Sequence, residues 1–345
     1  MVLQYKCPNC GADMVFDSES GMLVCDSCGA KQPADQYKDP SGERDQPAST
    51  LQDTREYQCN NCGAVLITDK DTTATTCSFC GAPMILNDRL SGSLAPAKII
   101  PFSISKEEAQ AAFKKWCKNG LLTPKDFMTA DRIKNITGIY VPFWLYDVHT
   151  DAVLEATCTR VRSYSRGDYI YTETSYFDVF RQADLKYLKV PADASEKMND
   201  ELMDKLEPYR YDNLKDFNTP YLAGFIAEKY NYTDQDLLGR MKERVRQYAG
   251  SYLNGTIAGY STTSVRREDV RFTEQDAYYT LLPVWMVCYD YKQSEHVFAM
   301  NGQTGKIVGK PPLSKKRMAG WFAGIAGGTF LLIKLIAFLI GGVFF

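Results

Sequence analysis

Eight of the 11 cysteines stand in the first 80 residues, arranged as four Cys-x-x-Cys pairs. Zinc prefers thiolate sulfur, and a structural site needs four ligands around one tetrahedral centre. Each pair supplies two ligands in a tight knuckle, and the glycine after its second cysteine lets the backbone turn without a Cβ clash. We therefore expect two zinc ions. Their ligands are Cys7, Cys10, Cys25 and Cys28 for the first ion, and Cys59, Cys62, Cys77 and Cys80 for the second.

The two cysteine sets belong to a repeat. Residues 5–30 align without gaps on residues 57–82, and both copies read C-x2-C-x14-C-x2-C. The 14 intervening residues suffice for a short hairpin that returns the second knuckle to the first, which predicts two zinc ribbons. Four redox-active Cys-x-x-Cys pairs are an alternative, but they would require a βαβ context, which the sequence around them does not show. Ligands shared between the copies are a further alternative, disfavoured by the 30 residues that separate Cys28 from Cys59.

Charge limits what the ribbons bind. Residues 1–90 carry 7 Lys and Arg against 13 Asp and Glu, whereas binding to phosphate backbones requires basic side chains. The ribbons are therefore expected to be structural or protein-binding, and nucleic acid is the less favoured partner. No apolar signal segment precedes the first cysteines, so we expect the reducing cytoplasm, where clustered cysteines bind metal.

The middle of the chain mixes helical and strand patterns, which predicts an α+β domain with mainly antiparallel strands. We expect helices within 105–120, 194–208 and 233–252, the last with Leu237, Met241, Val245, Tyr248 and Tyr252 along one helical face. Residues 138–161 and 168–180 read as strands joined by the turn SRGD. The fragments YVPFWLYD and LLPVWMVCYD resemble each other and suggest two related β-units. Their prolines favour a strand start or edge.

Catalytic chemistry is not evident in this region. Cys158 and His149 could lie close in a hairpin, but a small buried cysteine and a strand histidine are the favoured interpretation. Asp147, His149 and Asp151 alternate along one strand face and could bind a metal, which is the less favoured interpretation of these residues. The chain has no glycine-rich phosphate loop and no nucleophile elbow. We expect a protein that is not an enzyme.

The C-terminal segment has the composition of a membrane helix. Residues 319–345 carry one charge, Lys334, and about 20 apolar residues suffice to span a bilayer. Lys315, Lys316 and Arg317 precede it and place that side in the cytoplasm. Gly320, Gly324 and Gly328 recur on one helical face. They either reflect the frequency of glycine in membrane helices or form a face that pairs with a second copy or another membrane helix.

These patterns divide the chain into seven parts. They are zinc ribbon 1 (1–32), a flexible linker (33–56), zinc ribbon 2 (57–86), a linker (87–97), the α+β cytoplasmic domain (98–312), a basic juxtamembrane segment (313–318) and a transmembrane tail anchor (319–345).

Several segments occur in a specific order: CPNCGA, IIPFSISKEEAQAAFKKW, GIYVPFWLYD, YLAGFIAEKY, LLPVWMVCYDYK, FAMNGQTGKIVG and the terminal apolar run. In this combination the chain resembles bacterial TFIIB-type zinc-ribbon-containing, tail-anchored membrane proteins of the YdjG type. The resemblance implies a membrane complex that recruits a phage-shock PspA-like protein in envelope stress. Family knuckles typically have proline after the first cysteine. Asn60 departs from that pattern without an expected effect on ligation.

The sequence thus predicts a single-pass protein of the cytoplasmic membrane with its N-terminus and folded domains in the cytoplasm. We expect an adaptor that docks partner proteins at the lipid membrane, and the resemblance implies a role in the envelope-stress response. Two alternatives stay open. One is a membrane-tethered regulator whose ribbons contact nucleic acid or RNA polymerase, and the other is a membrane-associated enzyme using cysteine and histidine.

Overall fold

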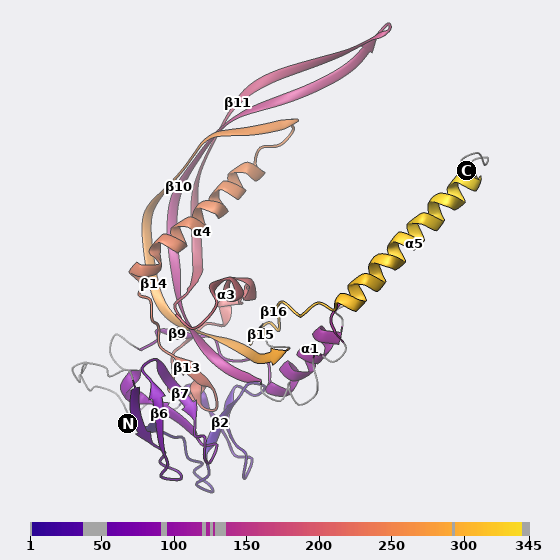
Figure 1. The fold of residues 1–345 in the computed structure, drawn as a ribbon. Helices are drawn as coiled ribbons and strands as arrows, with labels where there is room; N and C mark the ends of the chain where they lie inside the picture. The colour runs from indigo at the N-terminus through magenta and orange to yellow at the C-terminus, as the bar shows by residue number, and fades with distance from the viewer. Residues whose placement is uncertain are drawn as a thin grey trace.

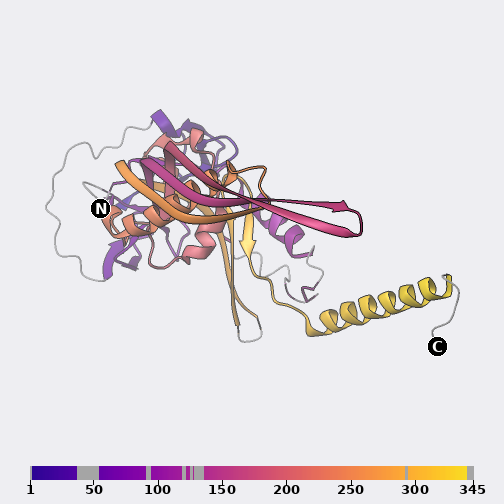
Figure 2. The ribbon, with the colours of Figure 1, turned by 90° about the horizontal axis from the view of Figure 1, so that it is seen from above.

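The structure, a computed structural model, describes residues 2–36, 54–90, 95–118, 122–124, 127, 136–291 and 294–339. A base holds the N-terminal cysteine segments, a long twisted stalk rises from it, and a terminal helix leaves the base separately (Figures 1 and 2). The stalk is the part of the chain in which three long strands continue beyond the base. These strands are β10 (Thr137–Arg166), β11 (Tyr169–Asp193) and β14 (Thr262–Tyr291).

One sheet joins 11 strands of the described chain. Its main path runs β1-β8-β7-β13-β10-β14-β15-β16, with β11 beside β10, and with β9 pairing both β14 and β12. The central pair, β10 and β14, is antiparallel, as predicted for most of the sheet. The shorter strands are β1 (Val2–Leu3), β7 (Thr72–Thr76), β8 (Pro83–Leu86), β9 (Lys98–Ile99), β12 (Lys215–Asp216), β13 (Ile226–Glu228), β15 (Ser294–Asn301) and β16 (Ile307–Gly309).

The α+β domain consists of two halves with the same order of elements. The first half runs β9, α1 (Lys106–Lys118), β10 and β11, and the second runs β13, α4 (Asp234–Gly255), β14 and β15. The halves exchange their first strands, because β9 lies parallel to β14 while β13 lies parallel to β10. The two similar fragments noted in the sequence pair with each other, with Val141 opposite Leu282.

The prolines of these fragments lie inside strands, so the predicted position at a strand start or edge is wrong. Pro142 falls where the neighbour of β10 changes from β13 to β11. Pro283 falls where the neighbour of β14 changes from β9 to β15. A proline lacks the N–H that a ladder requires. Each therefore occupies a position at which one neighbouring strand has ended and the next has not begun.

Three helices of the domain match the predicted ranges, although α3 (Asp200–Leu206) begins six residues after the start of its predicted range and α4 ends three residues beyond its own. Ser105 and Glu108 form a capping pair at α1, Asn199 caps α3, and Thr233 and Asp236 form a capping box at α4. The predicted helical face of α4 is buried at Leu237, Met241 and Val245 but not along its whole length. Its last turns bury Ala249 and Leu253, whereas Tyr248 and Tyr252 are 41% and 55% exposed.

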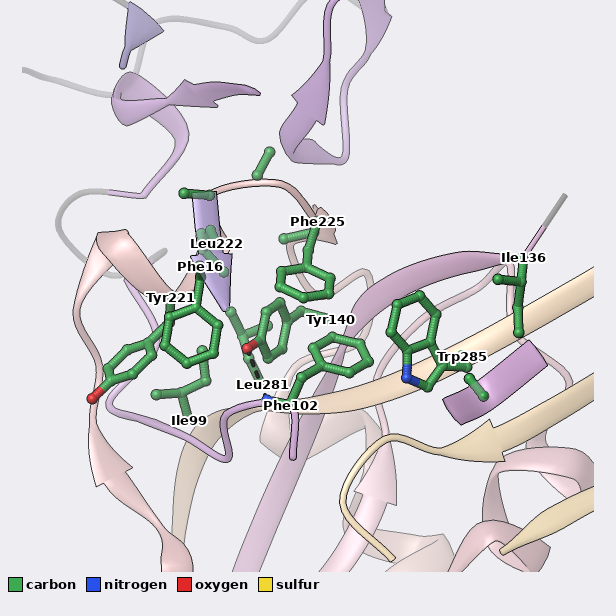
Figure 3. Close-up of a cluster of buried hydrophobic side chains, with 14 of the residues drawn as sticks. Phe16, Ile99, Phe102, Ile136, Tyr140, Tyr221, Leu222, Phe225, Leu281 and Trp285 are labelled. Carbon is green, nitrogen blue, oxygen red and sulfur yellow. Dashed lines mark hydrogen bonds between the residues drawn. The ribbon is translucent and has the colours of Figure 1, made fainter. Parts of the chain in front are cut away.

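The core of the base collects aromatic rings from all parts of the chain (Figure 3). Phe102 stacks on Phe225 with ring centroids 4.2 Å apart, and Trp285 lies 4.9 Å from Phe102. Gly138 permits this packing, since a Cβ there would lie 2.6 Å from Cδ1 of Phe225. Phe16, from the first cysteine segment, contacts Tyr221 at 5.2 Å. The N-terminal segments thus belong to the core.

Helix α5 (Lys315–Leu339) leaves the base alone (Figures 1 and 2). Its segment Lys315–Ile336 has a mean hydropathy of 1.6 over its most apolar window, none of it buried, so it is long and apolar enough to cross a membrane. Its start is held to the base, because the Ser314 N–H donates to Leu122 O and Arg317 donates to Thr123 O at 2.7 Å. Residues 340–345 of the predicted span lie outside the described chain.

The two predicted linkers are shorter than expected where they can be followed. β4 (Lys31–Pro33) and the 3-10 turn Ala34–Gln36 continue into the first linker, and β5 (Thr54–Gln58) starts before its predicted end. A 3-10 turn, Asn87–Arg89, opens the second linker and buries Arg89. Residues 37–53 and 91–94 lie outside the described chain.

Candidate metal centres

The eight cysteines gather into the two predicted sets. In each set the four sulfur atoms lie within 4.8 Å of one another. The Sγ atoms of Cys7 and Cys28, and of Cys10 and Cys25, are both 3.5 Å apart. Those of Cys59 and Cys80 are 3.8 Å apart, and those of Cys62 and Cys77 are 3.7 Å apart. Ligands are therefore not interleaved between the copies.

These separations fit zinc. Four thiolates about 2.3 Å from a tetrahedral ion lie about 3.8 Å from one another. The donors, four sulfurs in each set, are those of closed structural zinc sites, which leave no position for water or substrate. The two tetracysteine sites thus fit two zinc ions.

All four knuckles repeat one local geometry. In the first, the N–H of Gly11 donates to Cys7 O at 2.9 Å and the N–H of Cys7 donates to Ala12 O at 2.8 Å. Gly11 has φ 74°, and the glycines of the other knuckles lie between 74° and 77°. A side chain is strained in this left-handed region, so glycine is required for the turn.

Each site has a buried half and an exposed half. The first cysteine of every knuckle is buried, and the second is exposed. Cys7 and Cys25 belong to the main aromatic core, whereas Cys59 and Cys77 belong to a smaller cluster with Met84. A zinc ion in ribbon 1 would therefore join its knuckles directly to the core of the α+β domain.

Ribbon 1 is docked by its hairpin. Strands β2 (Met14–Asp17) and β3 (Met22–Cys25) form a small sheet with β4, and the N–H of Phe16 donates to Ala223 O at 3.0 Å. The Tyr5 hydroxyl hydrogen-bonds the Thr219 hydroxyl. Asn218 donates to Ala34 O at 2.7 Å. Backbone, polar and aromatic contacts together fix this ribbon on the domain.

Ribbon 2 enters the central sheet itself. Its β5 and β6 (Val65–Asp69) form a separate hairpin, but β7 pairs with β13 through Ala74 and Ala227. Strand β1, at the start of ribbon 1, pairs with β8, with Val2 opposite Leu86. Sequence reasoning could not find these pairings, because the repeat makes both ribbons look like equal and separate modules.

Two charged groups that the sequence did not single out hold ribbon 2. The guanidinium of Arg89 is buried, donates to Asp69 O and to Thr72 O, and lies 5.1 Å from the centroid of the Tyr57 ring. Lys197 of the domain bonds Asp69 at 2.6 Å and Glu228 at 3.1 Å. The hydrogen bonds of Lys197 hold the pKa of Asp69 well below its ordinary value, against the opposing effect of burial.

Side chains around the second site support its ligands. The Asn61 amide donates to Cys80 Sγ at 3.6 Å, and the Gln4 amide donates to Cys59 Sγ at 3.8 Å. The Ala82 N–H and the Asn61 amide lower the pKa of Cys80 to about 6, which favours the thiolate that zinc binds. Asn60, the departure from proline, donates to Val2 O at 3.0 Å and so ties the two ribbons together.

The acidic and histidine residues of β10 do not form a metal site. Within the described ranges, the two cysteine sets are the groups found that could hold a metal. His149 pairs with Asp184 at 3.4 Å, and Asp147 accepts the Lys189 N–H at 2.8 Å. Cys158 is buried and donates to Thr263, and it faces α4, on the opposite side of β10 from His149.

The predicted membrane residues all lie on α5. Gly320, Gly324 and Gly328 are open, with nothing within 4 Å of a Cβ built on each. Lys315, Lys316 and Arg317 form the first turn of the helix. Arg317 serves the fold as well, through its bond to Thr123.

Comparisons with known proteins agree with these features. The sequence model of the TFIIB zinc-binding family matches residues 5–45. The uncharacterized protein YdjG of Bacillus subtilis (strain 168) is 59% identical over 344 residues, which cover 100% of both chains. No solved structure matches. With identity of this size over the full length of both chains, and with its own N-terminal segment matching the TFIIB zinc-binding family, the chain belongs to the family of YdjG.

Proposed function

We propose that this chain is a non-enzymatic adaptor, anchored in the cytoplasmic membrane by α5, that docks partner proteins on its cytoplasmic side. The observation that carries the proposal is the exposure of the apolar segment of α5. A helix of 25 residues with large apolar side chains such as Phe322, Leu331 and Phe338 uncovered has no cover in the described chain, and a bilayer supplies one.

The zinc sites support an adaptor over an enzyme. A site closed by four cysteines stabilises a fold and leaves no position for substrate. Both ribbons are packed into the domain, which makes zinc part of a rigid platform. The platform carries the stalk, whose length and exposed surface suit the presentation of a docking surface.

Insertion of α5 into the bilayer requires that the stalk stay outside the hydrocarbon. Its strands carry charged side chains such as Asp151, Asp178 and Arg271, and its borders expose backbone groups, neither of which the hydrocarbon tolerates. Since α5 and the stalk extend toward the same side of the base (Figure 1), α5 turns away from the stalk when it inserts. Lys315 and Lys316 then remain at the cytoplasmic surface.

Membrane extraction tests the anchor. The full chain should resist high salt and alkaline carbonate, because the hydrocarbon holds α5 without help from charge. A chain ending at Leu313 should be soluble and retain two zinc ions per molecule. Release of the full chain by carbonate would refute the anchor, and insolubility of the zinc-loaded shortened chain would show a second membrane attachment.

The partner we propose is a PspA-like protein, as the family resemblance implies. Crosslinking in native membranes followed by capture of the full chain should enrich that protein above a control carrying α5 alone. Equal recovery with both baits would remove this partner and leave the anchor proposal standing.

A regulator that contacts nucleic acid is the second candidate, favoured by the TFIIB zinc-binding match. The acidic balance of residues 1–90 opposes it. Because ribbon 2 is part of the central sheet, the appropriate probe is the chain 1–313 and not an isolated ribbon. We expect no retardation of duplex or single-stranded DNA at physiological salt. Binding that weakens steeply with salt would favour the regulator.

A further inference from the structure

One border of the stalk is an unpaired strand edge. β11 pairs with β10 on one side, and no strand of the described ranges pairs with its other side. From Tyr169 to Tyr187 the pairing with β10 runs without a register shift. A regular edge of this length exposes a row of backbone N–H and C=O groups that can pair with another strand.

The opposite border differs. β14 has two register shifts against β10, which leave Arg266 and Thr273 unopposed. Such bulges bend and twist a strand, and they are a common protection of sheet edges against pairing. Of the two borders of the stalk, β11 is therefore the one suited to take another strand.

The side chains of β11 alternate regularly along this edge. Even-numbered residues from Asp178 to Leu188 are exposed, whereas odd-numbered residues from Phe177 to Lys189 are partly or fully covered. Val179, Leu185 and Tyr187 of the odd set pack on the α4 side. Only an even shift of register keeps both faces matched when a second strand is added.

The exposed edge of β11 can pair with the same edge of a second copy, related by a two-fold axis that passes beside one residue. An antiparallel copy of β11 centred on Gln182 sets Asp178 opposite Lys186 twice. On the α4 face the same register sets Val179 opposite Leu185 and Phe177 opposite Tyr187. Opposite charges and apolar pairs across strands are both stabilising.

The neighbouring registers are worse. A shift by two residues one way sets Asp178 opposite Asp184 and Arg181 opposite itself. A shift the other way leaves Lys186 opposite Phe180 and Asp178 opposite Leu188. Charged edge residues normally deter pairing, so an arrangement in which one register sets Asp178 opposite Lys186 favours a second copy over an unrelated strand.

Helix α4 lies beside this edge and contributes exposed aromatic side chains to it. Tyr248 and Tyr252 of α4 are exposed, and the ring centroid of Tyr248 lies 6.1 Å from that of Tyr187 of β11. The dyad of such a pair is normal to the sheet, so both α4 helices lie on the same face. Two strand spacings separate them, about 10 Å, which is the usual distance between packed helices.

We propose that the chain forms a two-fold dimer in which β11 pairs antiparallel with β11 of a second copy about Gln182. The stalks then share one six-stranded sheet, and the tyrosines of the two α4 helices fill the space between them. With both anchors in one bilayer, the dyad lies along the bilayer normal and the stalks lie parallel to the membrane surface. That orientation satisfies the requirement that the stalk stay out of the hydrocarbon.

Site-specific photocrosslinking in membranes tests this arrangement. A benzophenone amino acid at Gln182 of the full chain, in a mixture of isotopically heavy and light copies, should join position 182 to residues 180–184 of the other copy. The matched control places the probe at Arg271, which is exposed on the β14 border and should give no product between copies. A Gln182 product with another protein, or no product at all, would overturn the dimer.

Charge reversal tests the register. Asp178→Lys and Lys186→Asp each set like charges opposite one another at two places, and each should weaken the dimer about tenfold. The double variant exchanges the charges and should restore the crosslink. Each variant should retain two zinc ions, which shows that it is folded. Association that survives both single variants would belong to α5 and contradict the β11 interface.

Discussion

At the scale of single residues, the cysteines of each site differ by burial although all eight are equivalent as ligands. Cys25 lies at 0% exposure in the core that contains Phe16 and Tyr221, while Cys28 is exposed. The sequence predicts that loss of one ligand unfolds one ribbon alone. The structure indicates a wider effect, because ribbon 1 shares its core with the domain.

Cys25→Ser and Cys28→Ser should each lower the zinc content from two ions per chain to one, because three thiolates do not close a tetrahedral site. Each should also destabilise the chain ending at Leu313 by about 3 kcal/mol or more, since ribbon folding and docking are coupled to metal binding. Elemental analysis and urea unfolding measure the two effects. Cys117→Ser, a buried cysteine outside both sites, should retain two ions.

Asp193 gives the fold a pH dependence. It is 1% exposed, and burial raises its pKa from an ordinary value near 3.8 to about 7, with Ser195 N–H as a bond to only one of its oxygens. The folded state then binds a proton that the unfolded state has lost, so stability falls as pH rises from about 4 to about 7. A shift of three units corresponds to about 4 kcal/mol.

Asp193→Asn should remove this dependence. We expect the variant to match the wild type near pH 4 and to exceed its free energy of unfolding by about 2–4 kcal/mol at pH 8. Urea unfolding of the chain ending at Leu313 at both pH values measures the difference. An equal effect at the two pH values would show that burial of the charged form is not the cause.

At the scale of elements, the hairpin β2–β3 carries Phe16, an aromatic side chain through which ribbon 1 packs on the domain. Phe16→Ala should cost about 3–5 kcal/mol, as expected for a buried aromatic side chain, because its contacts with Tyr221 and Phe225 are lost. Zinc should remain at two ions per chain, since the ligands are untouched. Val65→Ala, at an exposed position of ribbon 2, is the control and should be within about 0.5 kcal/mol of wild type.

A result in which Phe16→Ala also loses zinc would contradict the separation of docking from ligation. Limited proteolysis adds an independent measure, because an undocked but metal-bound ribbon 1 should be cut near residue 33 and not between its cysteines.

Much of this element structure follows from local sequence. The knuckles, the caps at Ser105 and Thr233 and the turn at Gly167 are each set by residues close in the chain, and of these the sequence predicts the knuckles, the Ser105 cap and the turn. The positions of Pro142 and Pro283 and the exposure of Tyr248 could not be predicted, because each depends on which distant strand or helix lies alongside. Periodicity fits both Tyr248 and Ala249 on α4, and only the packed sheet decides between them.

At the scale of the whole molecule, α5 offers a face for association with another membrane helix in addition to anchoring the chain. Gly324→Leu should leave insertion intact but weaken association of α5 with another helix, if the face of Gly320, Gly324 and Gly328 is a contact. Ala326→Leu, on the opposite side of the helix, is the control. Reporter fusions of α5 alone measure the association. Equal signals for both variants would show that the glycines reflect only the usual composition of membrane helices and do not form a contact face.

Because the two halves exchange their first strands, the first half cannot complete its strand pairing until the second half is present. Strand β9 can pair with β14 only after β14 has been synthesised, because Lys98 lies opposite Thr280. In the same way β10 gains its parallel neighbour β13 only later, because Ile139 lies opposite Ile226. Contacts of such sequence separation form slowly, so the first half emerges from synthesis with β9 unpaired and with β10 paired to β11 alone. A chain divided between Asp193 and Asp200 should yield fragments that are unstable apart and that complete one another when mixed, as interlocked halves would.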